Sequence, residues 1–529
     1  MIEFLKRPLA ALALVALAAC SNGNGTGVTP APAPPAPGVP SNGGIVQQNF
    51  VGVGDSLTAG FQSSGLLGDP TATSPASALP GGAVPVTQEN GFWALMYLKY
   101  NGLALDPAKY NLDTAVGSPK GPLPLIKAPG LGSQLVLNAT TLLAPTHSGC
   151  DGFNDQAFSP SAWSLTRLGP GAPIADVAVP GITTHEVLSM VSPLTGPPNG
   201  PNCGYVSLPG DVTSGPLQAL VQGESLMFYP MLGQFQQTLG AGKTTELGAA
   251  ASMHPKLATV WLGGNDILKY IESHGQSPAT DSPTQYASDL QQIITTLQKG
   301  GAQVVVADLP DILGHPHSGE PPIATFIAQT SLAADLEQLG VPAALAVPTA
   351  SYVQTTYTKG PGGFVLINGV LSIVSQLQQN PAAPVVLDPA GPGSGDGQVY
   401  LDQTFAAQAI ALNDAYNQTT DAVATATGAA LAPVTSTFVG LSSTGVPLAP
   451  GVTLTTRYGG GIFSFDGVHP SDTGYALVAN LFIQAADTKY SLTIPPVTAA
   501  EVGGIASADP YNPFVIKTLD PAYPLPFNQ

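Results

Sequence analysis

The sequence predicts an α/β fold: a three-layer α/β/α sandwich around a mostly parallel central sheet of about five strands. Short, continuous apolar runs rich in valine alternate with longer segments whose apolar residues recur at helical spacing. Such runs are typical of strands that are buried on both faces, as the strands of a parallel sheet are. The chain of 529 residues is also long enough to enclose a core of this kind.

The expected strands follow one another with helices and long loops between them. The five apolar runs lie at about 45–55, 174–179, 257–262, 302–309 and 429–434. Apolar residues recur at helical spacing across 283–300, and an Ala-rich stretch covers 404–426, so both segments are expected to be helices. Segments rich in Gly, Pro, Thr and Ser are expected to be loop insertions without internal repeats, at 63–173, 192–254 and 341–403.

Composition limits the kinds of partner. Hydrophobic residues make up 44% of the chain and charged residues only 9%, which is typical of a globular protein with a substantial core. The net charge at pH 7 is -18. Because nucleic-acid binding depends on clustered Lys and Arg, this charge argues against a nucleic-acid partner. The sequence does not predict an oligomeric state.

The N-terminus has the features of a bacterial export signal. Lys6 and Arg7 precede an apolar run that is too short to cross a bilayer and is typical of a secretory signal. This run ends in L-A-A-C at Cys20, which resembles a lipobox, where the cysteine is lipidated and becomes the first residue after cleavage. The alternative is an ordinary cleaved signal that happens to contain a cysteine.

A lipoprotein reading defines the expected segments of the chain. They are a signal peptide over 1–20, a Gly- and Pro-rich tether over 21–44, the main domain over 45–490 and a C-terminal tail over 491–529. Ser21 after the cysteine resembles the sorting pattern of outer-membrane lipoproteins. We therefore expect an exported protein held at the outer membrane by an N-terminal lipid, on its periplasmic or cell-surface side.

The two remaining cysteines, Cys150 and Cys203, are expected to form a disulfide. An even pair of cysteines in an exported protein is normally oxidised, because the compartment favours disulfides. The alternative is two free, buried thiols.

Polar and small residues gather where the expected strands end. The first strand runs into Gly54-Asp55-Ser56-Leu57, the second ends at Gly181, and the third ends at Asn265. Because ligands bind at the carboxyl ends of strands in open α/β sheets, these residues are expected to share a site. Each also has a purely structural interpretation, since Asp55 and Ser56 could simply cap a helix.

A fourth motif near the C-terminus supplies the missing chemistry, because Asp466 and His469 lie three residues apart in F-D-G-V-H-P. A nucleophilic serine needs a base, the base needs a carboxylate that fixes its tautomer, and an oxyanion needs donors that are already in place. Taken alone, the pair could be a plain turn with a surface histidine. Together, the four motifs offer a candidate for every one of these roles.

The four motifs, in this order, resemble those of the SGNH or GDSL hydrolase superfamily of serine esterases and lipases, which have a flavodoxin-like α/β/α fold. The resemblance implies a triad of Ser56, His469 and Asp466. It also implies that the backbone N–H groups of Ser56 and Gly181 and the side-chain amide of Asn265 form the oxyanion hole. Gly181 departs from the pattern, because it lies in V-P-G-I-T where many members have Asn-x-Gly.

The resemblance implies a hydrolase that cleaves lipid or small acyl esters and needs no cofactor. Two alternatives stay open: a carbohydrate O-acetyl esterase or acyltransferase, and a non-catalytic lipoprotein that binds a ligand. Other motifs receive no role. Gly223-Glu224-Ser225-Leu226 lacks a preceding strand, His315 and His317 lack a third metal ligand, and His185 is expected to be an ordinary helix residue.

Overall fold

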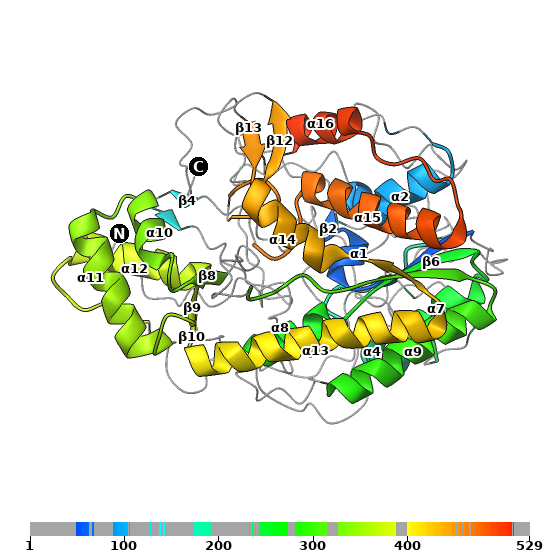
Figure 1. The fold of residues 1–529 in the computed structure, drawn as a ribbon, viewed down its shortest axis with the longest axis horizontal. Helices are drawn as coiled ribbons and strands as arrows, with labels where there is room; N and C mark the ends of the chain where they lie inside the picture. The colour runs from blue at the N-terminus through cyan, green and yellow to red at the C-terminus, as the bar shows by residue number, and fades with distance from the viewer. Residues whose placement is uncertain are drawn as a thin grey trace, which may run out of the picture.

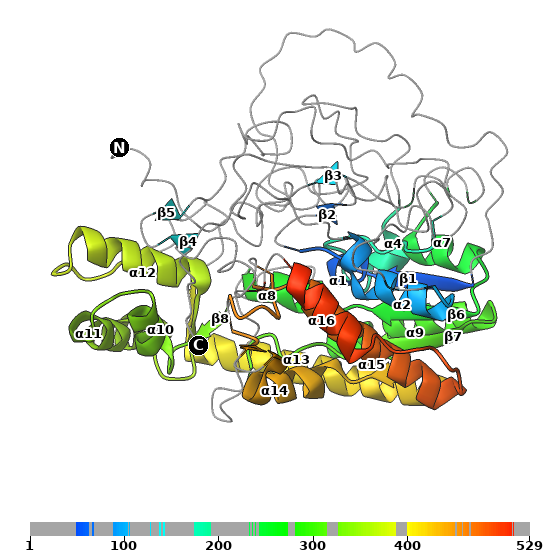
Figure 2. The same ribbon diagram turned by 90° about the horizontal axis from the view of Figure 1, so that it is seen from above.

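A computed structural model of the chain, drawn in Figures 1 and 2, describes residues 49–62, 66–67, 88–103, 105, 127–128, 137–138, 141–142, 174–191, 232, 235, 239, 243–272, 281–314, 326–387, 399–449, 452–457, 459–464, 467–509 and 512. The expected signal peptide and tether, with Cys20, lie outside these residues. So do Cys150, Cys203, His315, His317 and the G-E-S-L string at 223–226.

The central sheet contains four parallel strands: β1 (Phe50–Gly54), β6 (Leu257–Trp261), β7 (Gln303–Ala307) and β11 (Ala430–Ala432). They pair in the order β1-β6-β7-β11, and every pairing is parallel. All the residues of β1 and β6 are buried. The predicted strands at these four places are confirmed, with shorter bounds than the sequence suggested.

The segment predicted as the second strand lies beside β1 without forming a regular strand. It makes one parallel bridge, Asp176 with Gly52, and the N–H of Val179 donates to the carbonyl of Gly54 at 3.0 Å. Asp176 also accepts from the N–H of Ala178 at 3.1 Å, and such a local side-chain bond competes with strand pairing. Counted with this segment, the spatial order is 2-1-3-4-5, the flavodoxin-like order, with the reversal between β1 and β6.

Helices cover both faces of the sheet, which gives the predicted three layers (Figures 1 and 2). On one face lie α2 (Phe92–Tyr100) and α15 (Asp472–Tyr490), which pack against each other. On the other lie α7 (Glu246–Ser252), α9 (Pro283–Lys299) and α13 (Gln403–Thr427), with α9 and α13 side by side.

The two predicted helices, α9 and α13, form where the sequence supplies caps and an apolar stripe. Ser282 caps α9 by accepting from the N–H of Gln285, and Pro283 occupies the first turn, where its missing N–H costs nothing. Asp402 caps α13, and Gly428, with a φ of 71°, ends it in the left-handed conformation. The stripe that α9 buries is the one read from the sequence: Tyr286, Leu290, Ile293, Ile294 and Leu297.

A second group of elements lies beside the N-terminal end of α13, away from the central sheet (Figures 1 and 2). It contains the antiparallel strands β8 (Phe326–Ala328), β9 (Phe364–Leu366) and β10 (Tyr400–Leu401). Its helices are α10 (Leu332–Gln338), α11 (Ala343–Val353), the π-helical η7 (Gln354–Thr358) and α12 (Ile367–Gln379). The sequence predicted a loop insertion across 341–403, and that prediction is wrong for α11, η7 and α12. Pro348 lies inside α11, and an internal proline usually ends a helix.

The remaining elements are short or lie at the edges of the fold. Near the strand ends they are α1 (Ser56–Ala59), η3 (Gln88–Asn90), α4 (Glu186–Ser189) and α8 (Gly264–Glu272). After β11 they are α14 (Val434–Thr444), the hairpin of β12 (Val446–Ala449) and β13 (Val452–Leu454), and α16 (Ala499–Ala508). Two-residue strand pairs are formed by β2 (Leu66–Leu67) with β3 (Lys127–Ala128) and by β4 (Leu137–Asn138) with β5 (Thr141–Leu142).

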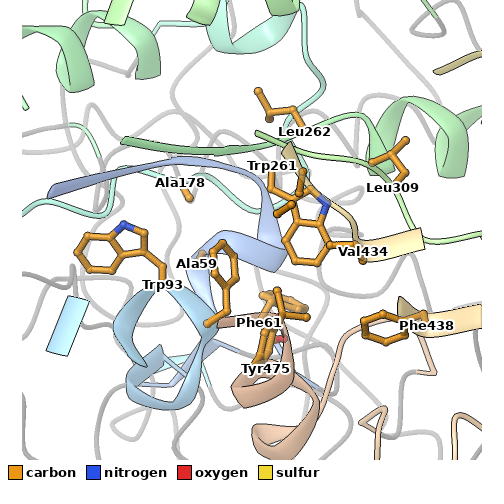
Figure 3. Close-up of a cluster of buried hydrophobic side chains, with 14 of the residues drawn as sticks. Ala59, Phe61, Trp93, Ala178, Trp261, Leu262, Leu309, Val434, Phe438 and Tyr475 are labelled. Carbon is orange, nitrogen blue, oxygen red and sulfur yellow. Dashed lines mark hydrogen bonds between the residues drawn. The ribbon is translucent and has the colours of Figure 1, made fainter. Parts of the chain in front are cut away.

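Large aromatic side chains fill the core between the sheet and the α2/α15 layer (Figure 3). The rings of Phe92 and Phe482 stack with centroids 4.5 Å apart, and Trp261 meets Phe92 edge-on at 5.4 Å. These side chains are almost completely buried, and burying a large apolar side chain contributes about 1.5–3 kcal/mol. This core fixes α15 against the sheet. No helix in the described part of the chain is long and apolar enough to cross a membrane.

Candidate active site

Ser56 and His469 are in hydrogen-bond contact although 413 positions separate them in the sequence. The Nε2 atom of His469 lies 2.8 Å from Oγ of Ser56. Ser56 directly follows the strand β1 and the cap Asp55, and opens the four-residue helix α1. The serine is nearly buried, with 8% of its surface exposed, while the histidine is partly exposed. A nucleophile and its base therefore lie within reach at the end of the first strand.

A tight loop just before α15 presents His469. The N–H of Ser464 donates to the carbonyl of His469 at 2.8 Å, and Phe463 pairs with Pro470 as an antiparallel bridge. Ser471 caps α15 and also donates its N–H to the carbonyl of Ile462, which ties the end of the loop to its beginning. The histidine is thus held from its backbone, next to a well-packed helix.

Phe61 and Tyr475 support the same arrangement from the serine side. The ring of Phe61 lies against the imidazole of His469, with centroids 4.9 Å apart. The hydroxyl of Tyr475, on α15, donates to the carbonyl of Phe61 at 2.8 Å. The segment after α1 and the helix after His469 are therefore tied together, and this contact fixes the distance between serine and histidine.

Asp466, the predicted third member of the triad, lies outside the described residues. Its neighbour Gly467 is described: its φ is 70°, a conformation that favours glycine, and its N–H donates to the carbonyl of Ser464 at 3.0 Å. Gly467 thus lies in a turn that closes the loop of His469.

Asp55 connects the serine segment to Asn265. Its Oδ1 accepts from the N–H of Leu57 at 2.9 Å, so the predicted helix cap is confirmed for this residue. Its Oδ2 accepts from the Nδ2 of Asn265 at 3.2 Å, a contact that sequence reasoning did not anticipate. Burial raises the pKa of Asp55 to about 6, against the opposing effects of the Leu57 N–H and the nearby charge of His469.

Asn265 and Gly181 meet at the same edge of the sheet. Asn265 lies in the first turn of α8, directly after β6, and its Nδ2 also donates to the carbonyl of Ile182 at 3.0 Å. Gly181, the residue before Ile182, has a φ of 85°, which explains why a glycine stands at this position. The structure thus brings Ser56, Asn265 and the segment of Gly181 together at the switch point between β1 and β6.

Glu246, a buried glutamate outside the sequence motifs, bonds to the backbone two residues before Ser56. Oε1 of Glu246, at the start of α7, accepts from the N–H of Gly54 at 2.7 Å. Burial raises the pKa of Glu246 well above its usual value, and the nearby Asp176 and Asp55 raise it further. Glu246 lies 192 positions from Gly54 and belongs to no motif, so only the folded structure reveals it.

One group of described residues could in principle hold a metal ion. Ligand atoms of His185, Asp281 and Asp289 lie within 4.8 Å of one another. Direct bonds already account for much of this arrangement: Nδ1 of His185 lies 3.0 Å from Oδ2 of Asp289, and Gln285 donates to Oδ1 of Asp289 at 2.9 Å. The side chain of His185 is also 52% exposed, as an ordinary surface residue would be. We therefore assign no metal to this group.

Comparisons with known proteins bear on this geometry. The family model described as GDSL-like Lipase/Acylhydrolase matches residues 170–482, more than half of the chain. No curated protein matches the chain significantly. Among solved structures, a protein from Parabacteroides merdae described as a GDSL-like lipase shares 10% identity, with 84% of this chain and 98% of that chain covered and a TM-score of 0.29.

The matched residues include Gly181, Asn265 and His469, and the match begins after Ser56. The hydrogen bond between Ser56 and His469 connects the serine to this matched region. The breadth of the family match, together with the four-stranded parallel sheet between two layers of helices, supports one conclusion. The chain belongs to the GDSL-like lipase/acylhydrolase family and is an ester-hydrolysing enzyme.

Proposed function

We propose that the protein is a serine hydrolase of carboxylic esters in which Ser56 is the nucleophile and His469 is the base. The distance of 2.8 Å between Oγ of Ser56 and Nε2 of His469 is the observation that carries this proposal. His469 takes the proton of Ser56 as the serine attacks the ester carbonyl, and then gives it to the leaving alcohol. Water, activated by the same histidine, releases the acyl group from the serine.

Asp466 is the proposed partner of His469. It lies three residues before the histidine in the sequence, and Gly467 between them lies in the turn that closes the loop. A carboxylate in that role holds the imidazole in the correct tautomer and stabilises the imidazolium that forms.

The proposed oxyanion hole consists of the backbone N–H groups of Ser56 and Gly181 and the amide of Asn265. One donor of this kind is worth about 3 kcal/mol in comparable sites. In the structure the amide of Asn265 donates to Ile182 at 3.0 Å and to Asp55 at 3.2 Å. To serve the oxyanion, Asn265 has to redirect one of its two N–H groups, and the longer bond to Asp55 is the one that is easier to exchange.

The proposed setting is an exported lipoprotein that carries a lipid on Cys20 and acts on lipid or small acyl esters. The lipobox-like L-A-A-C string and the Gly- and Pro-rich segment 21–44 support this setting. A disulfide between Cys150 and Cys203 belongs to the same proposal, because exported chains form disulfides readily.

Hydrolysis of p-nitrophenyl esters from acetate to palmitate by the detergent-solubilised chain tests the proposal. Ser56→Ala is expected to abolish turnover of every ester, while the exposed serine variant Ser351→Ala leaves turnover unchanged. The chain-length optimum then separates a short-acyl esterase from a lipase. Full turnover by Ser56→Ala would contradict the proposed nucleophile, and release of acetate only from acetylated polysaccharide would contradict the proposed substrates.

A further inference from the structure

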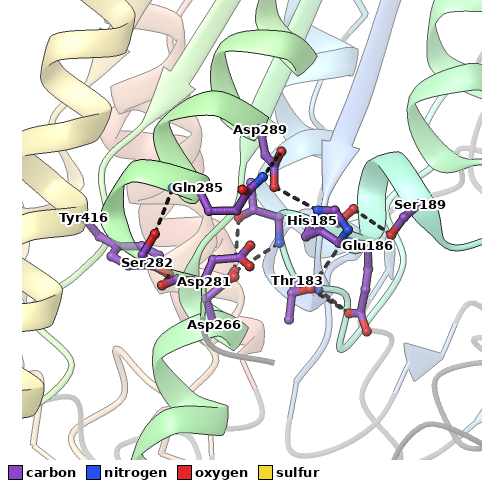
Figure 4. A network of polar contacts seen from close by, with 11 residues as sticks. Thr183, His185, Glu186, Ser189, Asp266, Asp281, Ser282, Gln285, Asp289 and Tyr416 are labelled. Carbon is purple, nitrogen blue, oxygen red and sulfur yellow. Dashed lines mark hydrogen bonds and ion pairs between the residues drawn. The ribbon is translucent and has the colours of Figure 1, made fainter. Parts of the chain in front are cut away.

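Asp266, the residue after Asn265, is completely buried and bonded to the segment that carries Gly181. Its Oδ2 accepts from both the backbone N–H and the Oγ1 hydroxyl of Thr184, each at 3.1 Å. Thr184 is itself fully buried and lies three residues after Gly181. Figure 4 shows the carboxyl group of Asp266 within the polar network between this segment and the helices α8 and α9.

We propose that Asp266 is a positioning residue that holds the Gly181 segment and Asn265 at the spacing that an oxyanion requires. This inference rests on the proposed function, because it assigns Asp266 a role in that same site. Asp266 does not touch the reacting atoms and acts through the two donors beside it.

Hydrogen bonds join the two segments that carry these donors. Asp266 receives two from Thr184, and Asn265 donates another to the carbonyl of Ile182 at 3.0 Å. Lys269, one turn further along α8, donates to Glu186 at 3.4 Å, and Glu186 in turn accepts from the N–H and the hydroxyl of Thr183 at 2.8 and 2.9 Å. Asp266 therefore holds Thr184 directly, whereas Lys269 acts on the segment through Glu186.

The conformation of Gly181 makes this connection necessary. A glycine with a φ of 85° has no side chain that could pack and hold the backbone in place. The orientation of its N–H therefore depends on bonds made by the residues around it. Thr184 supplies two such bonds from a single residue, and both end on the same oxygen of Asp266.

The buried surroundings of Asp266 disfavour the ionised carboxylate, which is a cost that a purely structural role would not explain. Burial raises the pKa of Asp266 to about 7, and the charge of Asp281 adds to this, while the bonds from Thr184 and the charge of Lys269 oppose it. Its second oxygen, Oδ1, has no hydrogen-bond partner among the residues that the structure describes. Burying a partly satisfied carboxyl group is costly, and such groups cluster at functional sites.

If Asp266 positions the oxyanion donors, its loss should change kcat rather than KM. Oxyanion donors act on the transition state, so misplacing them lowers kcat and leaves KM nearly unchanged. A displacement of about 1 Å can cost about 100-fold in rate. A residue that contributed only to folding would instead lower the melting temperature and leave the kcat of the folded fraction intact.

The test uses the full chain and four variants. Asp266→Ala removes both bonds from Thr184, Asp266→Asn keeps an acceptor oxygen at the same place, and Thr184→Val removes only the hydroxyl. Asp308→Asn is the matched control, because Asp308 is a buried carboxyl just after β7 whose side chain accepts from the N–H of Thr435. The measurements are kcat and KM on a p-nitrophenyl ester, inhibition by an aryl trifluoromethyl ketone, and melting temperature.

We expect Asp266→Ala to lower kcat by about 10- to 100-fold with KM changed less than about threefold. Affinity for the trifluoromethyl ketone, which forms a tetrahedral adduct with the serine, should fall by a similar factor. Asp266→Asn should recover most of the loss, and Thr184→Val should show a smaller loss of the same kind. Asp308→Asn should keep the kcat of the parent enzyme even where its melting temperature falls.

Wild-type kcat in a folded Asp266→Ala variant would overturn the inference, and so would a loss confined to KM or shared equally by Asp308→Asn. If Asp266→Ala does not fold, Thr184→Val decides: unchanged kcat and inhibitor affinity in that variant overturn the inference. Failure of the proposed function looks different, because Ser56→Ala would then retain turnover whatever the Asp266 variants do.

Discussion

Asp55 lies between the groups that the proposed chemistry uses. Its two oxygens accept from the N–H of Leu57 and from the amide of Asn265, and the nearby His469 opposes the rise in its pKa. Because burial raises the pKa of Asp55 to about 6, this carboxyl group changes charge close to neutral pH.

The sequence predicted the contact between Ser56 and His469, on which the proposed chemistry depends. Ser56 and His469 were paired through their motifs, and the structure places their reacting atoms 2.8 Å apart. The partners of Asn265 and the role of Glu246 could not be predicted in the same way. Those contacts join residues 83 to 210 positions apart that share no motif, and only packing brings them together.

The first turn of the helix α15 packs closely against the loop that carries His469. The backbone of Gly474, in the first turn of α15, passes so close to the loop that an added Cβ would lie 2.3 Å from the carbonyl oxygen of Ile462. That carbonyl accepts from the N–H of Ser471, at the end of the loop that carries the histidine. A side chain at 474 therefore has to push the loop away from the helix.

We expect Gly474→Ala to destabilise the protein by about 1–3 kcal/mol, the usual cost of overpacking, and to lower kcat by moving His469. Gly503→Ala is the matched control, since Gly503 lies in the helix α16 with open space around it. That substitution should raise stability by about 0.5–1 kcal/mol. Urea unfolding and ester turnover measure both effects, and equal behaviour of the two variants would refute this description of the loop.

Helices and strands could be predicted where the sequence carries a strong cap, a clear apolar stripe or a continuous apolar run. The helices α9 and α13 carry a clear apolar stripe or a strong cap, and the strands β1, β6 and β7 are continuous apolar runs. The segment predicted as the second strand is not regular because the side chain of Asp176 accepts from the N–H of Ala178. The helices α11 and α12 were missed because Pro348 and the surrounding Gly and Pro residues resemble a loop.

At the scale of the whole molecule, buried carboxyl groups make stability depend on pH. Burial raises the pKa of Asp55 and Asp308 to about 6 and that of Asp266 to about 7, from a usual value of 3.8. Between about pH 4 and about pH 7 the folded chain therefore holds protons that the unfolded chain has lost. Each pKa unit of difference corresponds to about 1.4 kcal/mol.

The free energy of unfolding is therefore expected to fall as pH rises from about 4 to about 7. The net charge of -18 acts in the same direction, because self-repulsion grows as carboxyl groups ionise. Urea unfolding at about pH 5 and about pH 8 should show the higher midpoint at the lower pH. Asp308→Asn should reduce this difference, whereas equal midpoints, or a higher one at about pH 8, would contradict it.

The central claim, that Ser56 is a nucleophile activated by His469, is tested most directly by covalent labelling. The full chain is treated with a fluorophosphonate, which phosphonylates an activated serine with loss of fluoride, and the labelled peptide is identified by mass spectrometry. We predict a single adduct on Ser56 that is absent in Ser56→Ala and forms much more slowly in His469→Gln. An adduct on another residue, or ester hydrolysis that continues with Ser56 unlabelled, would contradict the claim.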